Sequence, residues 1–207
     1  FLLIFSMIAR VGLDSLIVKL IAVNYHSPDI QNSYLKKILV VSTLFSAIIS
    51  TILYFTSNNI ADIIFENDKL AFHLKISAFG ILPLNLIEVY ANYYKGRSNP
   101  IIFSIINQFF RFLGPFLVFS TAIFIAENDL RLPIFSTVLS FVFIALILLS
   151  FNLKKFNIFL NKRIDSFQSL IHQSFPMMMA SSIVLLMGWA DVFILGIFES
   201  EDIVGQY

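Results

Sequence analysis

The chain has 207 residues, of which 58% are hydrophobic and 13% are charged, and its formal net charge is +1. Soluble domains are about 45–50% apolar and about 25% charged, so this composition excludes a water-soluble globular domain. The small net charge gives no reason to expect nucleic-acid binding, and a sequence without Cys excludes disulfides and thiolate-bound metals.

Six apolar segments are long enough to cross a bilayer, whose ~30 Å hydrocarbon core needs ~20 helical residues. Transmembrane strands would be shorter and bounded by turn residues, which disfavours a barrel. The sequence therefore predicts an all-α, polytopic helix bundle in the cell membrane. The expected spans, in chain order, are about 1–25, 34–56, 71–94, 100–126, 132–153 and a last one within 166–207.

The first span carries three charged residues. Arg10 and Asp14 are four residues apart, a spacing that places them on one helix face within reach of an ion pair. At 1.5 Å per residue, Asp14 would lie ~15 Å from the cytoplasmic end of the helix. Lys19 is close enough to that end for its side chain to reach the interface, so we interpret it as structural.

The third and fourth spans each carry one charge, Glu88 and Arg111, on either side of the short link 95–99. In an antiparallel helix pair, Glu88 would lie ~10 Å and Arg111 ~18 Å above the two ends of that link. Their long side chains are therefore expected to meet. An ion pair that only fixes helix packing is the alternative to a functional role.

The last span contains GWADVFILG at Gly188–Gly196, with one carboxylate, Asp191, ~10 Å from the outer end of its helix. No basic residue lies within a helical turn, so Asp191 is expected to face a cavity or a partner span. An ionised side chain in mid-membrane costs ~2.5–3.5 kcal/mol unless it finds water or a partner. We therefore predict a translocation pathway lined by Arg10, Asp14, Glu88, Arg111 and Asp191.

Three prolines fall within spans: Pro83, Pro115 and Pro176. Each removes a backbone hydrogen bond and is expected to kink its helix, and kinked spans favour a transporter over a passive anchor. Membrane helices are also richer in Pro in general, which leaves a purely structural interpretation open.

Charges in the links alternate in sign along the chain. The links 26–37, 95–99 and 154–165 are mainly basic, with Lys36, Lys37, Lys95, Arg97, Lys154, Lys155, Lys162 and Arg163. The links 57–69, 127–131 and 199–202 are mainly acidic, with Asp62, Glu66, Asp68, Glu127, Asp129, Glu199, Glu201 and Asp202. Because basic links stay inside the cell, the first group is predicted to be cytoplasmic.

Motifs of nucleotide hydrolases, zinc peptidases and serine hydrolases are absent from the sequence. The three histidines, His26, His73 and His172, lie far apart at span ends. We therefore predict a protein that is not an enzyme and that has no cofactor and no metal site. Transport would then depend on an ion gradient or on the gradient of the substrate.

Two segments resemble a known family, the polysaccharide and O-antigen flippases of the multidrug/oligosaccharidyl-lipid/polysaccharide exporter superfamily. Residues 174–207, SFPMMMASSIVLLMGWADVFILGIFESEDIVGQY, resemble the seventh span, with the family pattern at Pro176, Asp191, Gly196, Glu201, Gly205 and Tyr207. Residues 8–22, IARVGLDSLIVKLIA, resemble the second span, with matches at Gly12, Leu13, Asp14 and Lys19.

The resemblance implies a fragment, incomplete at both ends, of a two-lobe alternating-access transporter with six or more spans in each lobe. Residues 1–153 would belong to the N-terminal lobe, 154–165 would be a basic cytoplasmic linker, and 166–207 would be the first span of the C-terminal lobe. The implied substrate is an undecaprenyl-diphosphate-linked oligosaccharide, flipped from the cytoplasmic to the outer leaflet. Membrane lipids, the polysaccharide assembly machinery and a coupling H⁺ or Na⁺ are the implied partners.

A diphosphate needs cationic groups inside the membrane, and Arg10 and Arg111 are the candidates. Within the superfamily, a drug/cation antiporter is the nearest alternative, and a flippase for a lipid-linked peptidoglycan precursor is another. A membrane-embedded glycosyltransferase or polymerase would place its catalytic residues in extended outer loops, longer than the link 57–69. A purely structural partner subunit is the remaining alternative.

Overall fold

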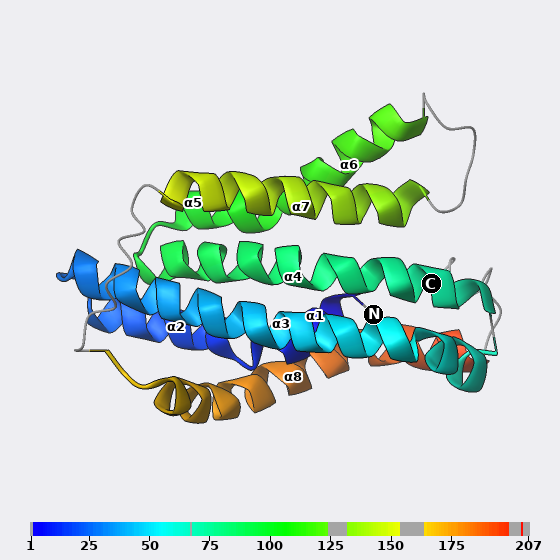
Figure 1. The fold of residues 1–207 in the computed structure, drawn as a ribbon, viewed down its shortest axis with the longest axis horizontal. Coiled ribbons are helices and arrows are strands. Elements are labelled where there is room, and N and C mark those ends of the chain that lie inside the picture. Colours follow the sequence, from blue (N-terminus) through cyan, green and yellow to red (C-terminus); the bar gives the residue numbers. More distant parts are fainter. Residues whose placement is uncertain (1, 67, 124–131, 154–163, 199–203, 205–207) are drawn as a thin grey trace.

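The computed structural model describes residues 2–66, 68–123, 132–153, 164–198 and 204. Within these residues every element of regular secondary structure is helical (Figure 1). The elements are α1 (Leu2–Arg10), α2 (Leu13–Val23), α3 (Pro28–Ile64), α4 (Asp68–Gly96), α5 (Pro100–Ser104), the π-helix η1 (Ile105–Phe109), α6 (Phe110–Ile123), α7 (Leu132–Leu153) and α8 (Phe167–Phe198).

The first span differs from the continuous helix expected over 1–25, because the chain breaks at Val11 and Gly12. Both residues have positive φ, 52° and 73°. A Cβ on Gly12 would lie 2.6 Å from the backbone nitrogen of Met178, so only glycine lets the two backbones approach so closely. The break therefore divides the span into α1 and α2 and packs their junction against α8.

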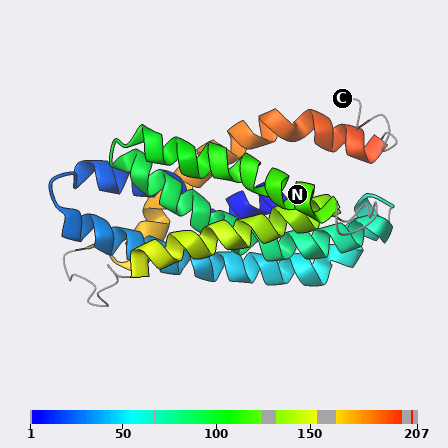
Figure 2. The same ribbon diagram turned by 90° about the horizontal axis from the view of Figure 1, so that it is seen from above.

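Helix α4 is the central element of the bundle. It packs against α1, α2, α3 and α7 and also contacts α5 and η1, and α6 packs against α7 (Figures 1 and 2). Its middle turns are buried on all sides, as Leu84, Ile87 and Tyr90 show with exposed fractions of 0–1%. A charged residue in these turns is therefore enclosed by protein rather than by lipid.

Local sequence signals explain where several helices begin. Pro28 and Pro100 occupy the first turns of α3 and α5, where a missing N–H costs nothing. Asn99 caps α5 by accepting a hydrogen bond from the backbone N–H of Ile102 at 3.2 Å. Ser166 likewise accepts from the N–H of Ser169 at the start of α8.

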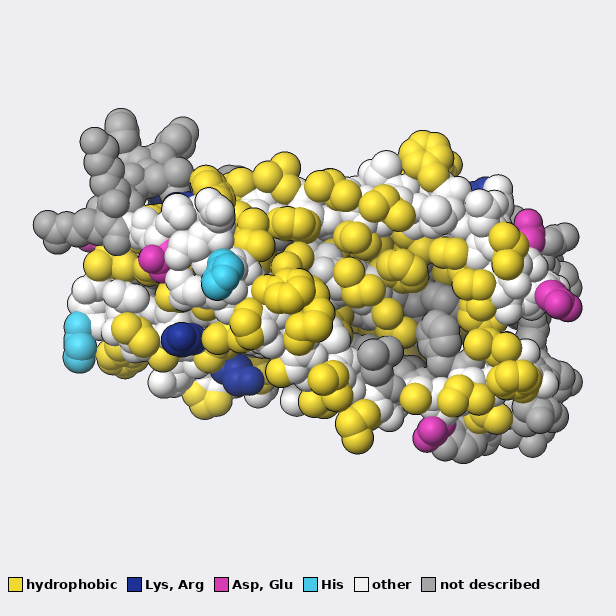
Figure 3. All heavy atoms as spheres, turned by 90° about the horizontal axis from the view of Figure 1, so that it is seen from below, with side chains coloured by type: hydrophobic (Ala, Val, Ile, Leu, Met, Phe, Trp, Pro, Cys, Tyr) yellow, Lys and Arg dark blue, Asp and Glu magenta, His cyan; other side chains and the backbone are white. Residues whose placement is uncertain are grey.

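Four helical segments of the described chain are long and apolar enough to cross a membrane: Pro28–Ile64, Leu70–Gly96, Pro100–Ile123 and Leu132–Ser150. The two halves of the first span, with 9 and 11 residues, are each too short to do so alone. Side chains in the middle of the bundle are largely apolar, and acidic side chains mark the end that holds the α3–α4 connection (Figure 3).

The three prolines expected at kinks lie inside helices, Pro83 in α4, Pro115 in α6 and Pro176 in α8. Helix α6, which contains Pro115, is inclined relative to α7 (Figure 1). Pro115 also has no N–H to donate to the carbonyl of Arg111, four residues earlier.

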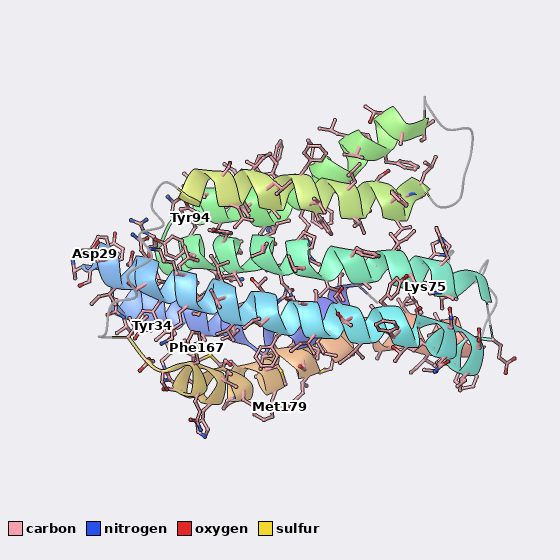
Figure 4. The ribbon with its side chains drawn as sticks, in the orientation of Figure 1. Asp29, Tyr34, Lys75, Tyr94, Phe167 and Met179 are labelled. Atoms are coloured by element: carbon pink, nitrogen blue, oxygen red, sulfur yellow. The ribbon has the colours of Figure 1, made fainter. Side chains whose placement is uncertain are left out.

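The end of the expected linker is held against α3. The side chain of Asp165 accepts a hydrogen bond from the Tyr34 hydroxyl at 3.2 Å, and its backbone carbonyl accepts one from Lys37. The Lys37 ammonium also lies 4.6 Å from the centre of the Phe167 ring, at the same end of the bundle as Tyr34 (Figure 4). Residues 154–163, the acidic link 127–131 and the motif residues Glu201, Gly205 and Tyr207 lie outside the described residues.

Candidate functional site: a buried charge cluster

The ion pair expected between Arg10 and Asp14 is present. The Arg10 Nε and Asp14 Oδ2 atoms are 3.2 Å apart. The pair spans the break between α1 and α2, so it joins the two half-helices as well as two charges. Asp14 lies in the first turn of α2, where the helix dipole favours a carboxylate, and its Oδ1 also accepts from the Ser15 N–H at 2.9 Å.

The meeting expected between Glu88 and Arg111 is also present. The Arg111 Nη1 atom lies 2.6 Å from Glu88 Oε1, a charge-assisted hydrogen bond between α4 and α6. The second carboxylate oxygen, Oε2, accepts from Asn107 Nδ2 at 3.2 Å. Both oxygens of a side chain that is only 9% exposed therefore have donors.

The two pairs form one cluster, because Arg10 Nη1 is 4.0 Å from Glu88 Oε1. The order of charges is Asp14, Arg10, Glu88 and Arg111, with alternating signs and a net charge of zero. The two inner members are more buried than the two outer ones, at 10% and 9% against 19% and 22% of side-chain exposure. Helices α1, α2, α4 and α6 each contribute one charge to this cluster, hereafter the charge cluster.

The π-helix η1 positions two members of the site. It inserts an extra residue into the turn at Ile105–Phe109, directly before α6, and Asn107 lies within it. With this local register, Asn107 and Arg111 reach the two oxygens of the same carboxylate. Single π-turns are rare and occur frequently at functional sites.

Sequence reasoning missed the polar support of Arg10. Asn85, 1% exposed, accepts from Arg10 Nη1 at 3.4 Å and donates from Nδ2 to Ser46 Oγ at 2.6 Å. Ser46 in turn donates to the backbone carbonyl of Ser42 at 2.6 Å. Asn85 is one helical turn before Glu88, and that spacing was the signal available in the sequence.

Asp191 occupies a different position. It lies on an exposed part of α8, and the ion pairs of the charge cluster join the other four predicted residues without it. Within the described chain, no group of three or more His, Asp or Glu side chains is placed to hold a metal ion.

The fold and the site define a class of protein. Four long apolar helices and a charge-balanced cluster enclosed within the bundle are features of a multi-pass membrane transporter. The model of the family described as "Polysaccharide biosynthesis protein" matches residues 1–207. The chain therefore belongs to this family, the polysaccharide and O-antigen flippases of the multidrug/oligosaccharidyl-lipid/polysaccharide exporter superfamily.

Membership places the chain among multi-pass proteins of the inner membrane, in a family whose members are generally transporters rather than enzymes. The family acts in polysaccharide biosynthesis and works on lipid-linked polysaccharide. No curated protein and no solved structure matches the chain.

Proposed function

We propose that the protein flips an undecaprenyl-diphosphate-linked oligosaccharide from the cytoplasmic to the outer leaflet, coupled to a gradient of H⁺ or Na⁺. The charge cluster is the observation that carries this proposal. A diphosphate cannot cross hydrocarbon unaided, and a fixed cation within the bundle lowers the cost of moving it. The polysaccharide assembly machinery would supply the substrate and receive the product.

The residues proposed for the pathway are Arg10, Asp14, Glu88, Arg111 and Asp191. The cluster supports this assignment for four of them, because a charge-balanced group is maintained inside the bundle where apolar packing would also be possible. Asp191 is proposed as a separate pathway residue on α8. The carboxylates would balance charge or take up the coupling ion.

The orientation proposed has the basic links in the cytoplasm. Lys36 and Lys37 lie in the third turn of α3, and Lys95 and Arg97 lie at the α4–α5 junction. Asp62 and Glu66 lie at the opposite end of α3, at the α3–α4 junction. Cysteines introduced at His26 and Asn59, both exposed, should be labelled by a membrane-impermeant reagent from opposite sides. Labelling of both positions from outside intact cells would contradict the orientation.

Export of surface polysaccharide tests the function. Arg111→Ala is expected to reduce export at least tenfold, about 1.4 kcal/mol of lost binding, while protein remains in the membrane. Arg97→Ala is the matched control, because this arginine is exposed at the end of α4 and contacts Tyr93 rather than the cluster. Normal export by Arg111→Ala would show that the Glu88–Arg111 pair only fixes helix packing.

A further inference from the structure

The two arginines of the charge cluster are held differently. Arg10 is placed among three groups, Asp14, Asn85 and Glu88, and its side chain is 10% exposed. The contact described for Arg111 is with Glu88, and its side chain is 22% exposed. Each guanidinium has one hydrogen-bonded neighbour, Asn85 for Arg10 and Glu88 for Arg111. Two carboxylates also lie within 4.0 Å of Arg10, so Arg10 is the more closely surrounded of the two.

The constraint on Arg10 extends into α3. The Asn85 amide is oriented by its donor bond to Ser46, whose own proton is committed to the Ser42 carbonyl. This leaves the Asn85 carbonyl oxygen directed at Arg10. A chain of buried hydrogen bonds that joins three helices therefore holds the Arg10 guanidinium. Its members Ser46 and Asn85 are only 0% and 1% exposed.

Arg111, in contrast, lies between two irregularities of its helix. The π-helix η1 ends at Phe109, and Pro115 follows Arg111 by one turn. Both features interrupt the regular backbone hydrogen bonding of the segment, which makes a local change in its conformation less costly. If Arg111 moved away, Glu88 would still have Arg10 as a cationic partner, because the two side chains are already 4.0 Å apart.

We propose that Arg10 is a positioning residue that is held in place by Asn85. Arg10 keeps Glu88 paired with a cation while Arg111 leaves the Glu88 carboxylate and binds the anionic group of the substrate. This inference rests on the proposed function. Only Arg111 contacts the anion, and Arg10 acts through Glu88. In this exchange of partners, Glu88 passes from Arg111 to Arg10. Without Arg10, release of Arg111 would leave a buried, unpaired carboxylate, which is energetically costly.

Binding of inorganic pyrophosphate to the purified intact protein in lipid nanodiscs, followed by calorimetry, tests the exchange. Arg111→Gln should weaken binding at least tenfold, since the contact itself is lost. Arg10→Gln should weaken it by about tenfold, because Glu88 then has only Arg111 and competes with pyrophosphate for it.

The decisive variant carries Arg10→Gln and Glu88→Gln together. Removal of the competing carboxylate should restore the Kd to within about threefold of the wild type, a double-mutant coupling that a simple loss of packing does not produce. Asn85→Leu should weaken binding by about threefold. Asn92→Ala is the matched control, because the Asn92 amide donates to the Glu88 backbone carbonyl at 3.0 Å and not to Arg10, and its Kd should be unchanged.

The outcomes separate the two proposals. A wild-type protein that does not bind pyrophosphate would contradict the anion pathway of the proposed function. If the wild type binds pyrophosphate but the double variant binds no better than Arg10→Gln, Arg10 contacts the anion directly. That result would overturn the exchange and leave the proposed function standing.

Melting temperatures measured on the same samples identify unfolded variants. If Arg10→Gln does not fold, Arg10→Lys replaces it, because lysine keeps a cation beside Glu88. Arg10→Lys should weaken pyrophosphate binding less than Arg10→Gln, and Glu88→Gln should again restore the affinity.

Discussion

Helices α4 and α8 are both long and apolar, yet they hold their carboxylates in opposite surroundings. Glu88 of α4 is enclosed by three helices and has donors on both oxygens. Asp191 of α8 lies on an exposed part of its helix, among apolar neighbours such as Val192 and Ile194 that are 38% and 55% exposed. The difference shows that membrane depth alone does not define a site, since the surroundings of each charge decide how far it is enclosed by protein.

The largest effect is expected from removing the centre of the enclosed cluster. Glu88→Ala leaves Arg10 and Arg111 without their shared carboxylate and should lower the free energy of unfolding by about 3–5 kcal/mol. Thermal unfolding in detergent and the protein level in the membrane measure the loss. Glu66→Ala, an exposed carboxylate beyond α3, is the matched control and should change neither.

A smaller effect is expected where α8 meets the bundle. Gly12→Ala places a Cβ against the α8 backbone at a residue with φ of 73° and should cost about 2 kcal/mol or more of folding stability. Gly188→Ala is the matched control on α8, because a Cβ there meets nothing within 4 Å. It should leave stability unchanged or raise it by about 1 kcal/mol through helix propensity. Equal melting temperatures for the two variants would contradict the close contact between α2 and α8.

The smallest effect on stability is expected at the exposed carboxylate. Asp191→Asn should change the free energy of unfolding by no more than about 0.5 kcal/mol, since exposed positions tolerate substitution. Polysaccharide export should fall nevertheless, because Asp191 is proposed to serve the pathway. Parallel losses of export and of membrane level would instead make Asp191 a folding residue, and the contrast with Glu88 would disappear.

Both ion pairs of the cluster could be predicted because they depend on regular geometry. Arg10 and Asp14 are one turn apart, and Glu88 and Arg111 lie on the two helices that flank a short link, within reach of each other's long side chains. Their connection through Arg10 and Glu88 could not be predicted, since it depends on where α1 crosses α4, and tertiary packing sets that crossing.

Local irregularities were the other features that sequence reasoning missed. The break at Val11 and Gly12 was expected to be continuous helix, because Gly occurs often inside membrane helices and its contact with α8 is more than 160 residues away in sequence. The π-turn at Ile105–Phe109 has no residue signature, and it accompanies the binding of Asn107 and Arg111 to the two oxygens of one carboxylate.

The attachment of Asp165 to Tyr34 and Lys37 has a mechanical consequence for α8. Helix α8 has 32 residues, so it is ~48 Å long, and it also packs against the α1–α2 junction at the backbone of Met178. A rotation of α8 by ~10° about its attached end, with repacking at Met178, would displace its far end by ~8 Å. A small rotation near the attachment to α3 would therefore produce a large displacement at the opposite end of the helix.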